Sequence, residues 1–295
     1  MIATTEALAA TASSGLRRWH RGGRATLGLY AQFMRLAFLK FLAYRLRYYT
    51  GVVSYTIFVA GNYFLFTALY ASRAEGADAA RIGGLTLAQM ITYVVVSWIG
   101  RSFYFNNIDR TLSHQVVQGE IAVQLIKPLH VQTMMMSEAL GEAAFRFLMF
   151  TLPITAVVVP LFGLQTPADP ALYGWTLLSF LLAFAVNAQI NFLVGCLAFR
   201  LQNIYGVIRA KMVMMEFLTG VLVPFTFFPE WVQTLVAWLP FQAVSYIPVT
   251  IFLGLREGSA LPAALLLQGV WAVGLFALGR WFWNRSVRQV TLQGG

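Results

Sequence analysis

Long segments without charged residues alternate with short charged segments along the chain. Five mostly apolar segments have a charged residue at each boundary: residues 48–72, 82–100, 147–168, 170–199 and 258–279. A helix needs about 20 predominantly apolar residues to cross a bilayer. The pattern therefore predicts one transmembrane helix in each of these segments.

The polarity pattern between the fourth and the last of these segments is less regular. Residues 212–228 are apolar apart from one glutamate and two threonines, and we predict the fifth transmembrane helix there. Residues 231–255 are also uncharged, so hydropathy alone permits a seventh helix. Pro240 and Pro248 each remove a backbone hydrogen-bond donor from this stretch and interrupt a continuous helix. We therefore expect one or two re-entrant or interfacial helices in it.

The distribution of basic residues favours six spans over seven. With a cytoplasmic N-terminus and six spans, 18 of the 21 lysines and arginines lie on the cytoplasmic side. This agrees with the positive-inside rule, by which cytoplasmic loops carry an excess of basic residues. A seventh span would place the basic C-terminus outside. We therefore expect both termini in the cytoplasm. The 231–255 stretch then lies at the outer face, with the rings of Trp231 and Trp238 at the level of the lipid headgroups.

The N-terminal segment is predicted to contain a disordered part and a helix. Residues 1–27 are small, polar and basic, without the apolar core of a signal peptide. Residues 28–48 mix basic with large apolar side chains, which predicts a helix in the cytoplasmic membrane interface. The alternative is an N-terminal extension of the first span. The six-span domain then covers residues 49–285, and residues 286–295 form a cytoplasmic tail.

Composition supports a membrane protein. The chain contains 59% hydrophobic and 11% charged residues, whereas soluble domains have about 25% charged residues. Long uncharged runs, in place of short alternating segments, favour helices over a barrel. The basic residues behind the net charge of +10 flank the apolar segments and do not form a separate polar domain. We therefore expect no binding to nucleic acid. The chain is therefore predicted to be an all-α polytopic membrane protein.

The sequence offers little catalytic chemistry. None of the three lysines, Lys40, Lys127 and Lys211, follows a glycine, so the chain has no Walker A loop. The three histidines have no metal-ligand spacing, and the single cysteine, Cys196, excludes an intramolecular disulfide. We expect neither an enzyme nor a cofactor on this chain.

A few polar side chains are predicted inside the membrane. Glu216 is the most costly of them because a carboxylate near hydrocarbon needs a partner or a wet cavity. Arg101 and Arg146 lie at a similar depth and can supply that partner, so a role in a substrate cavity and a structural ion pair remain alternatives. Asn187 and Asn191 share one helix face, which favours hydrogen bonds between helices.

The predicted loop between spans two and three carries a family resemblance. Its sequence is NNIDRTLSHQVVQGEIAVQLIKPLH, which predicts a short helix over 108–117 ending at Gly119 and a second amphipathic stretch ending at Pro128. This layout resembles the permease subunits of type-2 ABC exporters, which handle drugs and polysaccharides. The outer segment 222–241 and the basic helix before the first span resemble the same family. The resemblance covers nearly the whole chain.

The resemblance implies a mechanism in which the chain is the transmembrane subunit of an ATP-driven exporter. Residues 107–118 would form a coupling helix docked on a separate ATPase, which is present in two copies and binds ATP and Mg. The implied coupling residues are Asp109, Arg110, His114, Gln118, Gly119, Glu120 and Pro128. The translocation pathway would run between this chain and a second permease, a related chain or otherwise a second copy. The implied pathway residues are Ser97, Phe103, Met215, Glu216, Leu218 and Phe225. Their mixture of apolar and sparse polar groups favours an amphipathic or lipid-like substrate.

Two other functions remain open at this point. An ion-driven secondary transporter often has inverted repeats and charged residues at mid-span depth, and the sequence shows neither clearly. A membrane assembly subunit without transport activity is the second alternative. In each case we expect the chain in a bacterial inner membrane, in contact with its lipids.

Overall fold

The computed structural model describes residues 23–43, 46–72, 81–127, 129–201 and 203–288. All regular elements within these ranges are helical, which confirms the predicted all-α class. The longer helices are α2 (Gly23–Ala43), α3 (Leu46–Ala71), α4 (Leu87–Tyr104), α7 (Val131–Arg146), α8 (Leu152–Phe162), α9 (Ala171–Cys196), α10 (Tyr205–Leu218) and α13 (Ala260–Val287). The shorter helices are α5 (Ile108–Val117), α6 (Ile121–Leu125), α11 (Glu230–Ala237) and α12 (Tyr246–Phe252). Single turns of other types are η2 (Phe147–Thr151), η3 (Leu197–Phe199), η4 (Phe225–Phe227) and η5 (Pro240–Ala243).

Four helical segments are long and apolar enough to cross a membrane. They are Tyr48–Ala71, Val131–Phe162, Ala171–Phe199 and Ala260–Val287. Three of them match the predicted segments 48–72, 170–199 and 258–279, whereas Val131–Phe162 overlaps the predicted third span, 147–168, but begins 16 residues before it. The chain is therefore a helical membrane protein, as composition indicated.

The other two predicted spans correspond to shorter helices. The segment 82–100 contains most of α4, whose first turn is stabilised by a capping box between Thr86 and Gln89. The predicted continuous helix over 212–228 is wrong, because α10 begins at Tyr205 and ends at Leu218. Gly220 then adopts a φ of +79°, a conformation that favours glycine and ends the helix.

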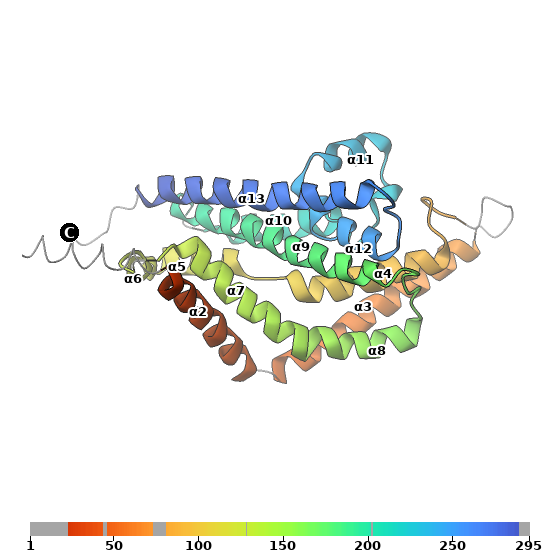
Figure 1. Cartoon of the computed structure of the whole chain (residues 1–295), viewed down its shortest axis with the longest axis horizontal. Coiled ribbons are helices and arrows are strands. Elements are labelled where there is room, and N and C mark those ends of the chain that lie inside the picture. The colour runs from red at the N-terminus through yellow and green to blue at the C-terminus, as the bar shows by residue number, and fades with distance from the viewer. Residues whose placement is uncertain (1–22, 44–45, 73–80, 128, 202, 289–295) are drawn as a thin grey trace, which may run out of the picture.

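The N-terminal boundary also differs from the prediction. Helix α2 already begins at Gly23, so residues 23–27, which we expected to be disordered, belong to its first turns. Residues 1–22 and 289–295, with the rest of the predicted disorder and most of the predicted tail, lie outside the described residues. Helix α2 packs along α7 and runs in a different direction from α3 (Figure 1), so it is a separate helix.

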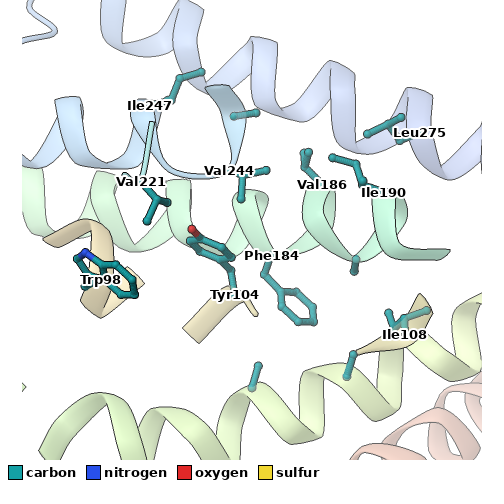
Figure 2. Close-up of a cluster of buried hydrophobic side chains, with 14 of the residues drawn as sticks. Trp98, Tyr104, Ile108, Phe184, Val186, Ile190, Val221, Val244, Ile247 and Leu275 are labelled. Atoms are coloured by element: carbon teal, nitrogen blue, oxygen red, sulfur yellow. The ribbon is translucent and has the colours of Figure 1, made fainter. Parts of the chain in front are cut away.

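Helix α9 is the centre of the bundle. It contacts α4, α5, α7, α12 and α13. Figure 2 shows its Phe184, Val186 and Ile190 surrounded by buried side chains of its neighbours. These neighbours include Trp98 and Tyr104 of α4 and Leu275 of α13. More than half of the apolar window of α9 is buried, in contrast to the outer helices.

The outer helices present apolar side chains to their surroundings. Ile57 and Phe64 on α3 and Leu266 and Val273 on α13 are each at least 65% exposed. Apolar surface of this extent is unfavourable in water and suits contact with lipid.

The connecting helices gather at opposite ends of the bundle. Helices α5 and α6 lie near one end, and α11 and α12 lie towards the other (Figure 1). The expectation of one or two short helices within 231–255 agrees with α11 and α12. Trp231 and Trp238 on α11 are 70% and 79% exposed.

The long helical segment Val131–Phe162 contains a widened turn. The π-helical turn η2 separates α7 from α8, and Pro153 is the second residue after its end. The proline ring cannot donate to, and would collide with, the carbonyl four residues earlier, which accounts for the widened turn.

Candidate functional site

Polar side chains are buried where the corner between α4 and α5 meets α9 and α10. We call Asn106, Asp109, Asn187, Asn191 and Lys211 the polar cluster. Lys211 Nζ lies 2.6 Å from Asp109 Oδ2 and donates a second hydrogen bond to Asn191 Oδ1 at 2.6 Å. The side chains of Lys211 and Asp109 are only 9% and 3% exposed. Two such charges are tolerated away from water because each neutralises the other.

The two asparagines of α9 complete the polar cluster. Asn187 Nδ2 donates to the carbonyl of Tyr104 at 3.0 Å, and Asn191 Nδ2 donates to Asn106 Oδ1 at 2.9 Å. The predicted role of both asparagines in hydrogen bonds between helices is thus confirmed. The sequence did not identify Lys211 and Asp109 as partners, and the only available signal was that both are charged residues next to apolar helices.

A second ion pair joins α4 to α10. Arg101 Nη2 donates to Glu216 Oε1 at 2.7 Å, which confirms Arg101 as the predicted partner of Glu216. Arg146 is not its partner, because it pairs with Glu142 one turn earlier on α7. The guanidinium groups of Arg101 and Arg146 lie 6.0 Å and 4.9 Å from the ring centre of Phe105. This aromatic ring therefore makes a favourable cation–π contact with each of the two guanidinium groups.

Little open space exists between the two ion pairs. A cavity of about 40 Å³ is lined by both basic residues, Arg101 and Lys211, and by Met215. This volume admits a few water molecules and is far below that of an organic ligand site. In this conformation the polar region inside the chain has no room for an organic ligand.

The predicted coupling residues fall into two groups. The helix predicted over 108–117 is confirmed, since α5 has these bounds. Asp109 faces the interior and anchors α5, so it is not a surface group. The coupling residues on the exposed side are Arg110, His114, Gln118, Gly119 and Glu120. His114 and Glu120 lie 3.9 Å apart, and Gly119 adopts a φ of +74° in the turn before α6. Pro128 lies outside the described residues.

The buried side of α5 is in close contact with α9. A Cβ atom added to Gly195 would lie 3.1 Å from the Cα of Asp109 and 3.0 Å from the Cβ of Leu112. The two backbones therefore approach as closely as a glycine allows. Helix α5 is fixed to α9 by packing and to α10 by the Lys211–Asp109 ion pair.

The predicted pathway residues are not brought together on one surface. Ser97 is completely buried, and Phe225 is buried with its ring 4.7 Å from that of Tyr246. Phe103 is partly buried between Phe147 and Phe184. The other three pathway residues are partly exposed on α10: Met215, Glu216 and Leu218. Helix α10 is thus the element on which this prediction can be tested.

Comparison with known proteins identifies one family. A family model described as ABC-2 family transporter protein matches residues 56–294, which is most of the chain. No curated protein matches the sequence.

Proposed function

The chain belongs to the ABC-2 family of transporter proteins, and we propose that it is the transmembrane subunit of an ATP-driven exporter. It acts as a permease and has a separate ATPase as its partner. Family membership favours this function over an ion-driven secondary transporter and over an assembly subunit without transport activity. ATP and Mg bind to the partner, in two ATPase copies, and this chain itself is not an enzyme. The complex works in a bacterial inner membrane.

Helix α5 has one buried and one exposed face, and this arrangement supports the proposed coupling to the ATPase. One face, with Ile108, Asp109 and Leu112, is buried against the bundle, and the other exposes Arg110 and His114. A helix that is fixed on one side and free on the other can receive force from a docked partner. We propose that the ATPase docks on the exposed face and on the turn at Gly119.

Two ion pairs connect α5 to the helices of the bundle. The Lys211–Asp109 ion pair joins α5 to α10, and the Arg101–Glu216 ion pair joins α10 to α4. A displacement of α5 driven by ATP therefore acts on both helices through charged contacts that are costly to break. The substrate pathway then opens beside α10, near Met215, Glu216 and Leu218.

The second permease is proposed to pack against the exposed side of α10. Val213, Met214 and Phe217 are 56%, 43% and 43% exposed there. The partner is a related permease or a second copy of this chain, and the pathway lies between the two. The mixed apolar and charged character of this side of α10 suits an amphipathic substrate.

Site-specific crosslinking tests the docking surface. We expect Gln118→Cys, in a Cys196→Ala background, to crosslink to the co-expressed ATPase, because Gln118 lies at the exposed end of α5. Arg110→Glu should lower the ATPase activity that depends on this chain, since it reverses the charge on that face. The measurements are crosslinked product on gels and ATP hydrolysis by the reconstituted complex.

Thr234→Cys is the matched control, because Thr234 is also exposed but lies on α11, towards the opposite end of the bundle (Figure 1). Equal crosslinking from both positions, or none from Gln118→Cys in a complex that hydrolyses ATP, would contradict the proposed docking surface.

A further inference from the structure

A cavity of about 300 Å³ lies between α2, the start of α5 and α7. This volume is at the lower end of the range for small-molecule sites. Helix α2 supplies an apolar wall with Phe33, Leu36 and Phe41, and α7 supplies Met135 and Ala139. None of these residues belongs to the coupling surface or to the pathway on α10.

Three charged residues line this cavity, and one of them, Glu142, is already paired with Arg146. Lys40 extends from α2 and Glu138 from α7. Among the described residues, neither Lys40 nor Lys127 approaches the Glu138 carboxylate within the 4 Å of an ion pair. Besides the paired Glu142, the cavity thus holds an acidic and a basic side chain that form no ion pair with each other.

In the ranges that the structure describes, Glu138 has no ion-pair partner, whereas the other acidic residues of α5, α7 and α10 have one. In those helices Asp109 pairs with Lys211, Glu142 with Arg146 and Glu216 with Arg101. Within the part of the chain that the structure describes, Glu138 is the carboxylate of these helices without an ion pair. A half-buried carboxylate at a membrane boundary is stabilised by a cation, which a ligand can supply.

The position of the cavity indicates the source of the ligand. Leu36 and Leu39 on α2 are 61% and 46% exposed, and Arg35 and Lys40 lie beside them in sequence. Exposed apolar side chains mixed with basic ones are typical of a helix in the membrane interface. The cavity under α2 therefore lies at the depth of phospholipid headgroups.

We propose that this cavity binds a phospholipid whose headgroup carries a primary ammonium group. The ammonium group donates hydrogen bonds to Glu138, and the phosphate lies near Lys40. The glycerol and the first acyl carbons pack on Phe33, Leu36 and Phe41. Asn107 and Thr111 at the start of α5 also line the cavity, so the bound lipid connects α2 to α5. This site stands independently of the proposed coupling to ATP.

Lipid binding to the delipidated full-length chain tests the site. Phosphatidylethanolamine, phosphatidylcholine and phosphatidylglycerol with identical acyl chains are added in detergent, and bound lipid is counted by native mass spectrometry. The choline headgroup has no N–H donor, and the glycerol headgroup has no cation. We expect the ethanolamine lipid to bind about tenfold more tightly than either, a factor that corresponds to about 1.4 kcal/mol.

Two variants separate the roles of the charges. Glu138→Gln should abolish the preference for ethanolamine over choline. Lys40→Gln should weaken binding of all three lipids while it retains that preference. Glu230→Gln on α11 is the control, because its carboxylate lies on another helix and does not line the cavity; it should bind like the wild type.

Three results would overturn the proposal. The first is equal binding of the ethanolamine and choline lipids to the wild type. The second is an unchanged preference in Glu138→Gln, which would assign Glu138 to the protein's own structure. The third is displacement of the lipid by an equal concentration of soluble phosphoethanolamine, because the apolar wall would then contribute nothing.

Discussion

Lys211 carries an ammonium group into the interior of the molecule, where Asp109 and Asn191 accept its hydrogen bonds. We predict that Lys211→Met destabilises the chain by about 3–5 kcal/mol, because Asp109 is then a buried charge without a partner. The double variant Asp109→Asn, Lys211→Met removes both charges and should recover much of the loss. Apparent melting temperatures of the purified variants in detergent give the comparison.

The exposed pair His114–Glu120 offers a control for this prediction. Its two side chains are 66% and 59% exposed, so Glu120→Gln should change stability by less than about 1 kcal/mol. If the single variant Lys211→Met and the double variant melt at the same temperature, the loss arises from packing and not from an unpaired charge.

The sequence predicted some of the polar contacts and missed others for a physical reason. Asn187 and Asn191 lie in an apolar helix, where an amide must find a partner on a neighbouring helix. Glu216 and Arg101 share a predicted depth in the membrane. Lys211 was predicted only as the boundary of an apolar run. Its pairing with Asp109 depends on the packing of α5 against α9 and α10, which no local pattern encodes.

The contact between α2 and α7 depends on a single glycine. A Cβ atom added to Gly141 would lie 2.1 Å from the backbone oxygen of Met34 on α2. Because backbone cannot move aside as a side chain can, Gly141→Ala should separate the two helices and destabilise the chain by about 2–3 kcal/mol. The measurement is again the apparent melting temperature.

Gly274→Ala on α13 is the matched control, since nothing lies within 4 Å of its added Cβ. Alanine in an open helical position stabilises by about 0.5–1 kcal/mol relative to glycine. Equal melting temperatures for the two variants would show that α2 is not held closely against α7.

The end of a helix could be predicted from the sequence where polar residues or a glycine mark it. Residues 108–117 are followed by a polar turn with a glycine, and α5 ends there as predicted. Residues 212–228 are apolar apart from one glutamate and two threonines, so hydropathy joined them into one helix. The structure ends α10 at Leu218, because Gly220 and then Pro224 lead the chain away from helical geometry. Hydropathy measures solvent preference and contains no information on backbone direction.

Two pairs of neighbouring long helices run parallel, which constrains the topology of the whole molecule. Between α3 and the α7–α8 segment, the ring centres of Tyr48 and Phe145 lie 5.0 Å apart, and those of Tyr63 and Phe162 lie 5.1 Å apart. In α9 and α13, Ser179 bonds to Gln268, and Phe192 lies 5.7 Å from Trp283. Parallel neighbours can be joined only if the intervening chain returns to the end from which the first helix started.

The returning segments are α4 in the first case and the chain from α10 to α12 in the second. Helix α10 has 14 residues, about 21 Å of helix, whereas the hydrocarbon layer is about 30 Å thick. In the proposed six-span topology, the non-helical backbone after Leu218 supplies the rest of the crossing. Such backbone is tolerated at membrane depth where protein covers it, and the neighbouring helix α12 is deeply buried from Ile247 to Ile251. Parallel packing and charge bias thus both support the proposed six crossings, four of which are helical segments long and apolar enough to span a membrane.

Cysteine labelling tests whether the segment from α10 to α12 crosses the membrane. In a Cys196→Ala background, a membrane-impermeant maleimide should label Thr234→Cys and Ser259→Cys in intact cells from which the outer membrane has been removed. Asn203→Cys should react only after permeabilisation, because it precedes α10 on the cytoplasmic side. All three positions are exposed in the structure, so burial does not limit their reaction.

If the segment does not cross, Ser259→Cys moves to the cytoplasmic side and α13 exports the basic C-terminus. Labelling of Ser259→Cys only after permeabilisation would therefore contradict six spans, and it would place α13 antiparallel to α9 in the membrane, against their parallel contacts.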